Sequence, residues 1–225
     1  ISSRRGYELY GPAGDSANSG VQGQRDWRTS RGQFHIVRKW GETLEVRRTN
    51  AAGEVVWETI WNDSGANAFA DTAAIMSVVW NDTRKIDELL ITAGNAKFYS
   101  WSGATTAITA TTATTIVGDG DLGGKGFDTT GGTVVINGTT YTYTGITTDT
   151  LTGVTPNPTG EADDSFVMDP LVANSIASIP TNFTCDYHGV YRNQAYFGSA
   201  TSRTVLVSDA LDYTNFLTST AVGGP

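Results

Sequence analysis

The chain has 225 residues, 15 basic and 23 acidic side chains and a net charge of −8, and 39% of its residues are hydrophobic. This composition is sufficient for a buried core, and no apolar run approaches the ~18 residues of a membrane span. The lone Cys185 excludes an internal disulfide framework, and the opening ISSRRGYELYG has no apolar signal-peptide core. The start without Met and the end at AVGGP indicate a processed chain or a part of a longer one.

Short strands are predicted along the first hundred residues. FHIVRKWGETLEVRR, residues 34–48, predicts a hairpin with its turn at Gly41-Glu42, which pairs Val37 with Val46 and Arg38 with Glu45. Further apolar runs bounded by Gly and Asn turns predict the next strands, over residues 55–61, 75–80, 88–92 and 96–101. This spacing favours an antiparallel all-β meander.

The middle of the chain is rich in threonine, with nineteen Thr in residues 104–155. The part up to Thr115 is expected to be an extended connector. Asn137-Gly138 predicts a two-residue hairpin that pairs Ile136 with Thr139 and Val134 with Tyr141. Val134, Ile136, Tyr141 and Tyr143 then share one face, and a second hairpin with Ile146, Leu151 and Val154 is expected to cover it. We therefore expect a small β-sandwich or hairpin module inserted into a larger domain.

Strands are predicted again in DYHGVYRNQAYFGSATSRTVLVSD, residues 186–209, with a turn at Arg192-Asn193. Sets of three or four short antiparallel strands favour irregular β-propeller-like blades, because radial blades leave few long exposed edges. The expected organisation is a first part of the blades over residues 1–116, the inserted module over 117–170, and a continuation of the blades over 171–225.

Several phrases resemble segments of tailed-bacteriophage structural proteins with β-propeller domains, such as proteins of the tail nozzle. They are AKFYSWSGA at 96–104, NQAYFGSATSRTVLVSDALDYTNF at 193–216 and the opening RRGYELYG. The resemblance covers residues 4–10 and 85–216, and members of that group are usually longer than this chain. It implies a ring-forming virion protein that binds neighbouring subunits and, in some cases, the host surface.

Three sets of residues are candidates for catalytic or metal sites. Asp119 and Asp121 in DGDLGG have the spacing of the first calcium ligands of an EF-hand, but the later acids and the bidentate glutamate are missing, which favours a glycine-rich turn. His35 and His188 are the two histidines; His188 and Cys185 are too few for a closed zinc site. Three residues apart along a strand, Cys185 and His188 would also point to opposite faces, which does not favour a nucleophilic pair.

Acidic residues in two loops are the other candidates for catalysis. Glu161, Asp163 and Asp164 could act as paired carboxylates in glycoside cleavage, although solvated charge is the simpler interpretation. In SDALDYTNF, residues 208–216, Asp209 and Asp212 are expected to accept hydrogen bonds from backbone amides of the turn.

Aromatic and basic side chains are the candidates for binding. Trp57 and Trp61 would share a face of a strand, and such rows can stack on sugar rings, although core packing is the default. The first fifty residues hold nine basic and five acidic groups, whereas residues 104–225 hold three basic and eleven acidic groups. This asymmetry suits head-to-tail packing in a ring, and scattered solvated charge is the alternative. The interaction candidates are Arg4, Arg5, Arg25, Arg28, Arg31, Tyr141 and Tyr143.

The residue pattern indicates an all-β chain that is poor in catalytic groups, and the resemblance implies a non-enzymatic structural protein of a tailed-phage virion, without a cofactor. Its expected partners are identical subunits in a ring, neighbouring tail proteins and a host-surface glycan. Excess acid repels phosphate, so nucleic acid is not expected as a ligand beyond passage through a lumen. The alternative is a glycan-binding or glycan-cleaving propeller, as a receptor-binding tail protein or an adhesin. A secreted bacterial adhesin would require a signal peptide on the full-length gene.

Overall fold

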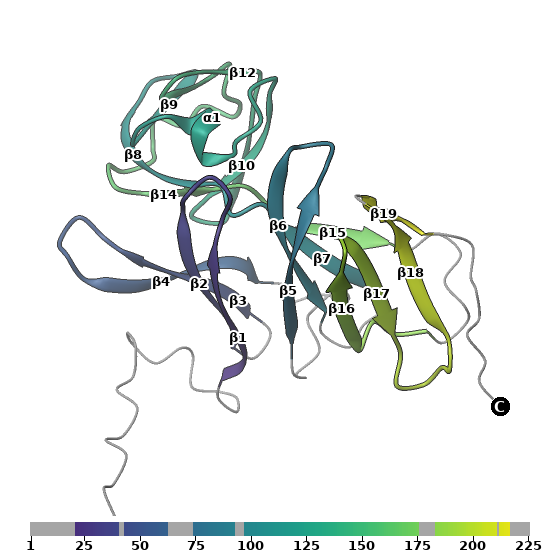
Figure 1. Cartoon of the computed structure of the whole chain (residues 1–225). Helices are drawn as coiled ribbons and strands as arrows, with labels where there is room; N and C mark the ends of the chain where they lie inside the picture. The colour runs from purple at the N-terminus through teal and green to yellow at the C-terminus, as the bar shows by residue number, and fades with distance from the viewer. Residues whose placement is uncertain are drawn as a thin grey trace, which may run out of the picture.

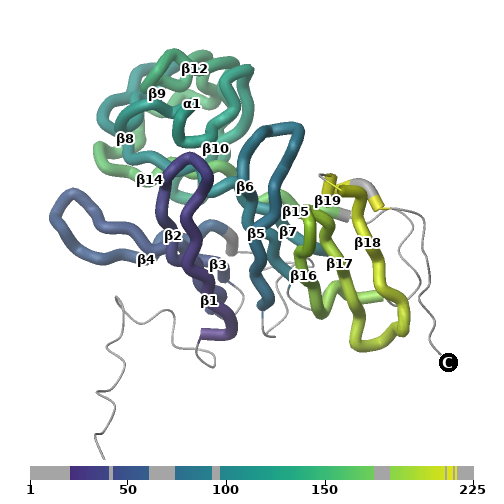
Figure 2. The backbone as a smooth tube through the Cα atoms, in the orientation of Figure 1, coloured from purple at the N-terminus to yellow at the C-terminus, as the bar shows by residue number. Residues whose placement is uncertain are grey.

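The computed structural model describes residues 21–40, 43–62, 74–92, 97–175, 183–210 and 212–216. These residues form nineteen strands and one short helix, arranged in four antiparallel sheets (Figures 1 and 2). Three sheets have four strands each, and the fourth has seven. The prediction of an all-β fold is confirmed. Within the described residues, no helix is long and apolar enough to cross a membrane.

The first sheet is a meander of four consecutive strands. They are β1 (Val21–Arg28), β2 (Phe34–Trp40), β3 (Thr43–Thr49) and β4 (Val55–Asn62). The predicted register is confirmed, since Val37 lies opposite Val46 and Arg38 lies opposite Glu45. The predicted turn at 41–42 lies outside the described residues. Alternation divides the sheet into an apolar inner face, with Val37 and Val46, and an outer face with Arg38.

The second sheet is interrupted in the sequence. Its strands are β5 (Ile75–Asn81), β6 (Ile86–Thr92), β7 (Lys97–Trp101) and β15 (Val172–Ser175), in the order β15-β7-β6-β5. The fourth strand therefore follows the third only after some seventy residues. Both faces of this sheet are covered: Leu89 and Tyr99 pack against the first sheet, whereas Leu90 and Phe98 pack against the third. This double burial explains the continuous apolar run in β6.

The chain between β7 and β15 forms the insert, a seven-stranded sheet rolled into a half-barrel. Its elements are β8 (Thr105–Thr111), β9 (Thr115–Gly118), α1 (Leu122–Lys125), β10 (Gly132–Ile136), β11 (Thr139–Tyr143), β12 (Gly145–Thr147), β13 (Thr150–Thr152) and β14 (Phe166–Met168). The predicted pairs Ile136–Thr139 and Val134–Tyr141 are confirmed. The second hairpin also forms, and Leu151 and Val154 pack in the same core as Val134.

One expectation about the insert was wrong. The stretch before Thr115 is not a connector: it forms β8, which pairs with β14 on one side and β9 on the other. The reason lies outside the local sequence. The partner strand β14 comes more than fifty residues later, and its residues Phe166 to Met168 bury their side chains between the insert and the first sheet.

The third sheet is again a meander. It contains β16 (Tyr187–Tyr191), β17 (Gln194–Gly198), β18 (Val205–Asp209) and β19 (Asp212–Phe216). The predicted turn at Arg192-Asn193 is confirmed, and both residues have positive φ, at 50° and 58°. This conformation is that of the I′ turns that join two-residue hairpins.

The three four-stranded sheets lie one after another, with their first strands side by side. β1 contacts β5, and β5 contacts β16, while the later strands of each sheet extend away from this row (Figure 1). In the described residues, the three four-stranded sheets form an open set and do not close into a propeller. The insert lies beyond one end of the first two sheets.

Candidate functional site

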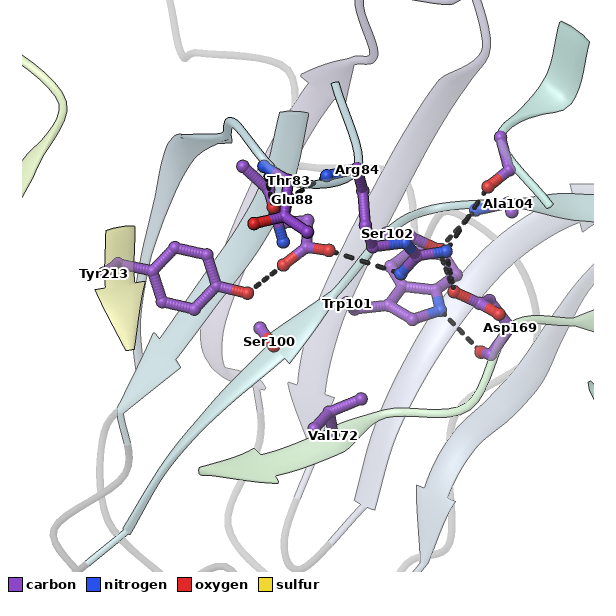
Figure 3. Close-up of polar contacts among 12 residues, drawn as sticks. Thr83, Arg84, Glu88, Ser100, Trp101, Ser102, Ala104, Asp169, Val172 and Tyr213 are labelled. Atoms are coloured by element: carbon purple, nitrogen blue, oxygen red, sulfur yellow. Dashed lines mark hydrogen bonds and ion pairs between the residues drawn. The ribbon is translucent and has the colours of Figure 1, made fainter. Parts of the chain in front are cut away.

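A buried polar junction ties the insert to the second and third sheets (Figure 3). Arg84, in the turn between β5 and β6, donates to Asp169 Oδ2 at 2.9 Å and to Glu88 Oε1 at 3.3 Å. Tyr213 of β19 donates its hydroxyl proton to Glu88 Oε2. One guanidinium therefore pairs with two buried carboxylates. Through Asp169, Glu88 and Tyr213 the network connects the insert, the second sheet and the third sheet.

The same junction joins the two crossings of the chain between the second sheet and the insert. Ser102 Oγ donates to Asp169 Oδ2 at 2.6 Å, and Trp101 Nε1 donates to the Asp169 carbonyl oxygen at 3.0 Å. The backbone amide of Asp169 donates in turn to the carbonyl of Ala104. Burial raises the pKa of Asp169, while Arg84 and Ser102 oppose the increase. The chain thus enters the insert through WSGA, residues 101–104, and these residues are hydrogen-bonded to Asp169, where the chain leaves the insert.

The candidate metal ligands have other roles in the fold. Asp121 is the N-cap of α1, where its Oδ1 accepts a hydrogen bond from the Gly124 amide at 3.0 Å. The backbone amide of Asp119 donates to Thr106 Oγ1 at 2.9 Å, and its carbonyl accepts from Lys125. Over the described part of the chain, no group of three His, Cys, Asp or Glu residues could hold a metal ion.

The candidate nucleophile and bases are each packed separately. Cys185 lies in the apolar core between the second and third sheets, and burial raises the pKa of its thiol to about 12. His188 Nδ1 is 2.8 Å from Thr92 Oγ1, and burial lowers the pKa of the ring to about 4. His35 packs against Trp27 and Trp101, with ring centroids 5.7 and 5.1 Å apart, and burial lowers its pKa to about 4. These environments favour neutral, structural side chains.

The acidic residues of the loop after β13 anchor the insert. Asp164 Oδ2 accepts from the Ala51 amide at 2.9 Å and from Arg48 at 3.3 Å, so it connects the insert to the turn before β4. The Ala51 amide lowers the pKa of Asp164 most, burial opposes the decrease, and Arg48 lowers the pKa further. Glu161 accepts from the Tyr141 hydroxyl at 2.5 Å and from Asn137 at 2.8 Å. Glu161 and Asp164 therefore make hydrogen bonds within the fold, whereas Asp163 is exposed, as predicted for a solvated charge.

The predicted turn role of Asp212 is confirmed, because its Oδ1 accepts from the amide and the hydroxyl of Thr214, at 3.0 and 2.6 Å. The shared face predicted for Trp57 and Trp61 rested on unbroken alternation. The pairing of β3 with β4 has a register shift between Leu44 and Glu45, which falls between these two positions on β4. The side chain of Trp61 is outside the described residues.

The interaction candidates fall into three groups. Arg4 and Arg5 lie outside the described residues. Arg25, Arg28 and Arg31 are exposed on β1 and the following turn, and Arg31 donates to the Gly123 carbonyl of the insert at 2.9 Å. Tyr141 and Tyr143 are 5% and 4% exposed and belong to the core of the insert. Their burial removes the two tyrosines from the candidate surface; the alternation that placed them beside Val134 already favoured this position.

Replacing Tyr141 with Phe should lower the free energy of unfolding by about 1 kcal/mol, because it removes the hydrogen bond to the Glu161 carboxylate. The loss is modest because Glu161 still accepts a hydrogen bond from Asn137. The Glu161 contact also raises the pKa of Tyr141 to about 12, so the contribution is complete below pH 10 and is lost as the pH rises through 12. Urea unfolding at pH 7 measures the loss, and absorbance titration of tyrosinate shows one fewer late-titrating group. If the variant keeps the same number of tyrosines that titrate near pH 12, the assignment of the late titration to Tyr141 is contradicted.

Two cavities border the insert. One, of about 510 Å³, lies between β4 and the β10–β11 hairpin, and its lining includes Glu58, Thr59, Val135 and Thr140. The other, of about 480 Å³, lies between the β5–β6 turn and the loop around α1 and is lined by Arg84, Asp121 and Asp128 among others. Glu58 in the first cavity is paired with Arg48 at 2.7 Å, and Arg84 in the second belongs to the buried junction. Both cavities therefore follow the seam where the insert meets the sheets.

The sequence analysis did not identify the exposed outer face of the third sheet. Tyr187 and Tyr191 are 57% and 62% exposed and lie on the same side of β16. The i, i+4 spacing of these two tyrosines in a strand is visible in the sequence and could have indicated the face.

Comparison of the chain with protein-family models, with curated proteins and with solved structures finds no match in any of the three.

Proposed function

We propose that the protein is a structural component of a tailed-phage tail, which assembles through the faces of its sheets rather than through a catalytic pocket. Its partners in this role are identical subunits and neighbouring tail proteins. The three four-stranded sheets are then propeller-like blades, and the insert is a module that extends from the second blade.

The observation that carries the proposal is the arrangement of the three sheets. The first strand of each sheet lies beside the first strand of the next, in the row β1, β5, β16 (Figure 1). Each sheet also packs a face on its neighbour through an apolar core. Radial sheets that share an inner row of first strands are the building principle of β-propellers, which is the fold that the phage resemblance implies.

The phrases of the resemblance add support because they occur at joints of the fold. Ser102 and Ala104 of the WSGA phrase bond to Asp169 where the insert leaves the second sheet. Tyr213 of the later phrase reaches Glu88 from the third sheet. Residues that connect the sheets and the insert in this way are those that proteins of the same fold would have in common.

The test is to look for the protein in particles. Phage particles would be induced from the organism that carries the gene and purified, and the protein quantified by mass spectrometry relative to the major capsid protein. We expect a few to tens of copies per particle, with antibody label at the tail in electron micrographs. A protein that stays in the lysate after the particles are removed would overturn the proposal. The glycan-binding alternative would be favoured by retention on an oligosaccharide array.

A further inference from the structure

Exposed apolar side chains gather at the two ends of the row of sheets. Among the described residues, six large hydrophobic side chains are exposed: Val21, Phe34, Val172, Tyr187, Tyr191 and Val205. Two of them lie on the outer face of the first sheet and three on the outer face of the third. In the part of the chain that the structure describes, no sheet covers these two faces, whereas the second sheet is covered on both sides.

The outer face of the third sheet, named here the tyrosine face, is set by cross-strand register. It consists of Tyr187, Tyr191, Tyr196, Val205 and Val207, with Gly189 and Gly198 between them. Tyr187 lies opposite Gly198, which lies opposite Val205, and Gly189 lies opposite Tyr196. The two glycines bring no side chain to this face, so the rings and the backbone between them form an open platform. The opposite face of the same strands, with Phe197 and Leu206, is buried against the second sheet.

The outer face of the first sheet, named here the tryptophan face, carries Val21, Phe34, Ile36, Trp40, Trp57 and the buried Arg38. The register also places polar and charged residues on this face: Gln24, Asp26, Arg28, Glu45 and Arg47. The guanidinium of Arg38 lies 3.9 Å from the Trp57 ring centroid and 5.1 Å from that of Trp40, and it pairs with Glu45 at 2.6 Å. Stacking and ion pairing hold these side chains as a flat, ordered surface. Phe34 is 53% exposed at its edge.

We infer that two copies of this chain close on each other, with the tyrosine face of each copy packed on the tryptophan face of the other. This inference rests on the propeller-like arrangement in the proposed function and names its first partner. The described residues form three such sheets, whereas the blades of a propeller number four to eight. Two copies supply six, and a head-to-tail contact of this kind forms a closed ring when its rotation returns to the start.

The size and charge of the two faces fit this partner. Four strands spaced ~4.8 Å apart and five residues long present roughly 320 Å² of flat sheet, so two contacts bury about 1,300 Å² over the pair of copies, within the range of specific interfaces. The described residues of the first sheet and its turns, 21–62, carry seven basic and four acidic groups, whereas residues 183–216 carry two basic and three acidic groups. These counts take in both faces and the turns of each sheet, and the net charges are opposite in sign, which favours a head-to-tail contact.

The test is the native mass of the purified chain and of a variant in the centre of the tyrosine face. A Cβ at Gly189 would meet nothing within 4 Å, so Gly189→Arg leaves the isolated fold intact while it places a cation where the partner packs. Gly160→Arg is the matched control, because a Cβ there also meets nothing and the residue lies in the insert. We expect twice the chain mass of 23.9 kDa for the unmodified protein and the control at micromolar concentration. Gly189→Arg should be a monomer, with a dissociation constant raised roughly tenfold or more.

A second variant tests the head-to-tail arrangement. Phe34→Arg on the tryptophan face should also be monomeric, whereas a dimer through two tyrosine faces would leave it unaffected. Mixing the two monomeric variants should give a mixed pair that is weaker than the unmodified dimer but tighter than either variant alone, because one of its two contacts joins an intact tyrosine face to an intact tryptophan face and the other carries both substitutions. Circular dichroism checks that both variants are folded.

The inference is overturned by a monomeric unmodified chain, by a mass other than two copies, by a dimer that Gly189→Arg leaves unchanged, or by a tyrosine face that binds oligosaccharide as a monomer. Its outcome is separable from that of the proposed function. A monomeric chain that is nevertheless found in virions overturns only the pairing, and a dimer that is absent from particles overturns only the virion role.

Discussion

Arg84→Met should be among the most destabilising single substitutions in the described chain, lowering the free energy of unfolding by about 3 kcal/mol at pH 7. Arg84 pairs with both Asp169 and Glu88, whose side chains are buried. Removing one partner of a buried ion pair leaves uncompensated charge in a region of low dielectric. Here a single substitution leaves two carboxylates in that state. Urea unfolding followed by far-UV circular dichroism measures the loss.

The loss should depend on pH in a defined direction. Burial raises the folded-state pKa of Asp169 above its unfolded value, so folding favours the protonated acid. The resulting contribution is complete below the unfolded pKa near 4 and is lost as the pH rises through the folded pKa. Without Arg84 the folded pKa rises further, because its positive charge opposes the shift. The deficit of Arg84→Met should therefore be smaller at pH 5 than at pH 7.

Two further variants isolate the cause. The double variant Arg84→Met/Asp169→Asn removes one of the stranded charges and should be more stable than Arg84→Met at pH 7. Lys85→Met removes the neighbouring cation, whose ion pair with Asp82 is exposed, and should leave the urea midpoint unchanged. If Lys85→Met and Arg84→Met cost the same, the buried junction does not stabilise the fold in the way described.

Local sequence signals predicted the elements whose partners are close in the chain. The pairs Val37–Val46 and Val134–Tyr141 follow from turns of two residues, which fix the register of a hairpin. The positive-φ turn at Arg192-Asn193 belongs to the same class. In each case the hydrophobic alternation and the turn residues agree, so a short window contains the information.

The rest could not be predicted because it depends on contacts between distant residues. β15 returns to the second sheet after the whole insert, and its partner β7 ends at Trp101. Arg84 finds Asp169 eighty-five residues later, and Glu88 finds Tyr213. No window of the sequence contains both members of these pairs. The tyrosine face was overlooked for a similar reason: which side of β16 faces solvent is decided by the packing of Phe197 on the second sheet.

Gly103→Ala is the second substitution with a large expected effect, a loss of about 2–5 kcal/mol. Gly103 has φ of +72°, where an L-residue costs about 1–2 kcal/mol. A Cβ would also lie 2.7 and 2.8 Å from two ring atoms of Trp27 and 3.2 Å from the His35 ring. Trp27 is held by Trp101, with ring centroids 6.0 Å apart, so it has little room to move. Overpacking of this kind costs about 1–3 kcal/mol.

The control that separates the two costs is Gly53→Ala. Gly53 has φ of +80°, but a Cβ there meets nothing within 4 Å, so this variant carries the backbone cost without the collision. We expect it to lose about 1–2 kcal/mol, less than Gly103→Ala under the same conditions. Gly103→Ala should also change the near-UV circular dichroism, because Trp27 and Trp101 must shift, and Gly53→Ala should not. Equal losses and unchanged spectra would show that Gly103 serves only its backbone conformation. A larger loss at Gly103 would show that the WSGA phrase requires glycine because the Trp27 ring occupies the space beside it.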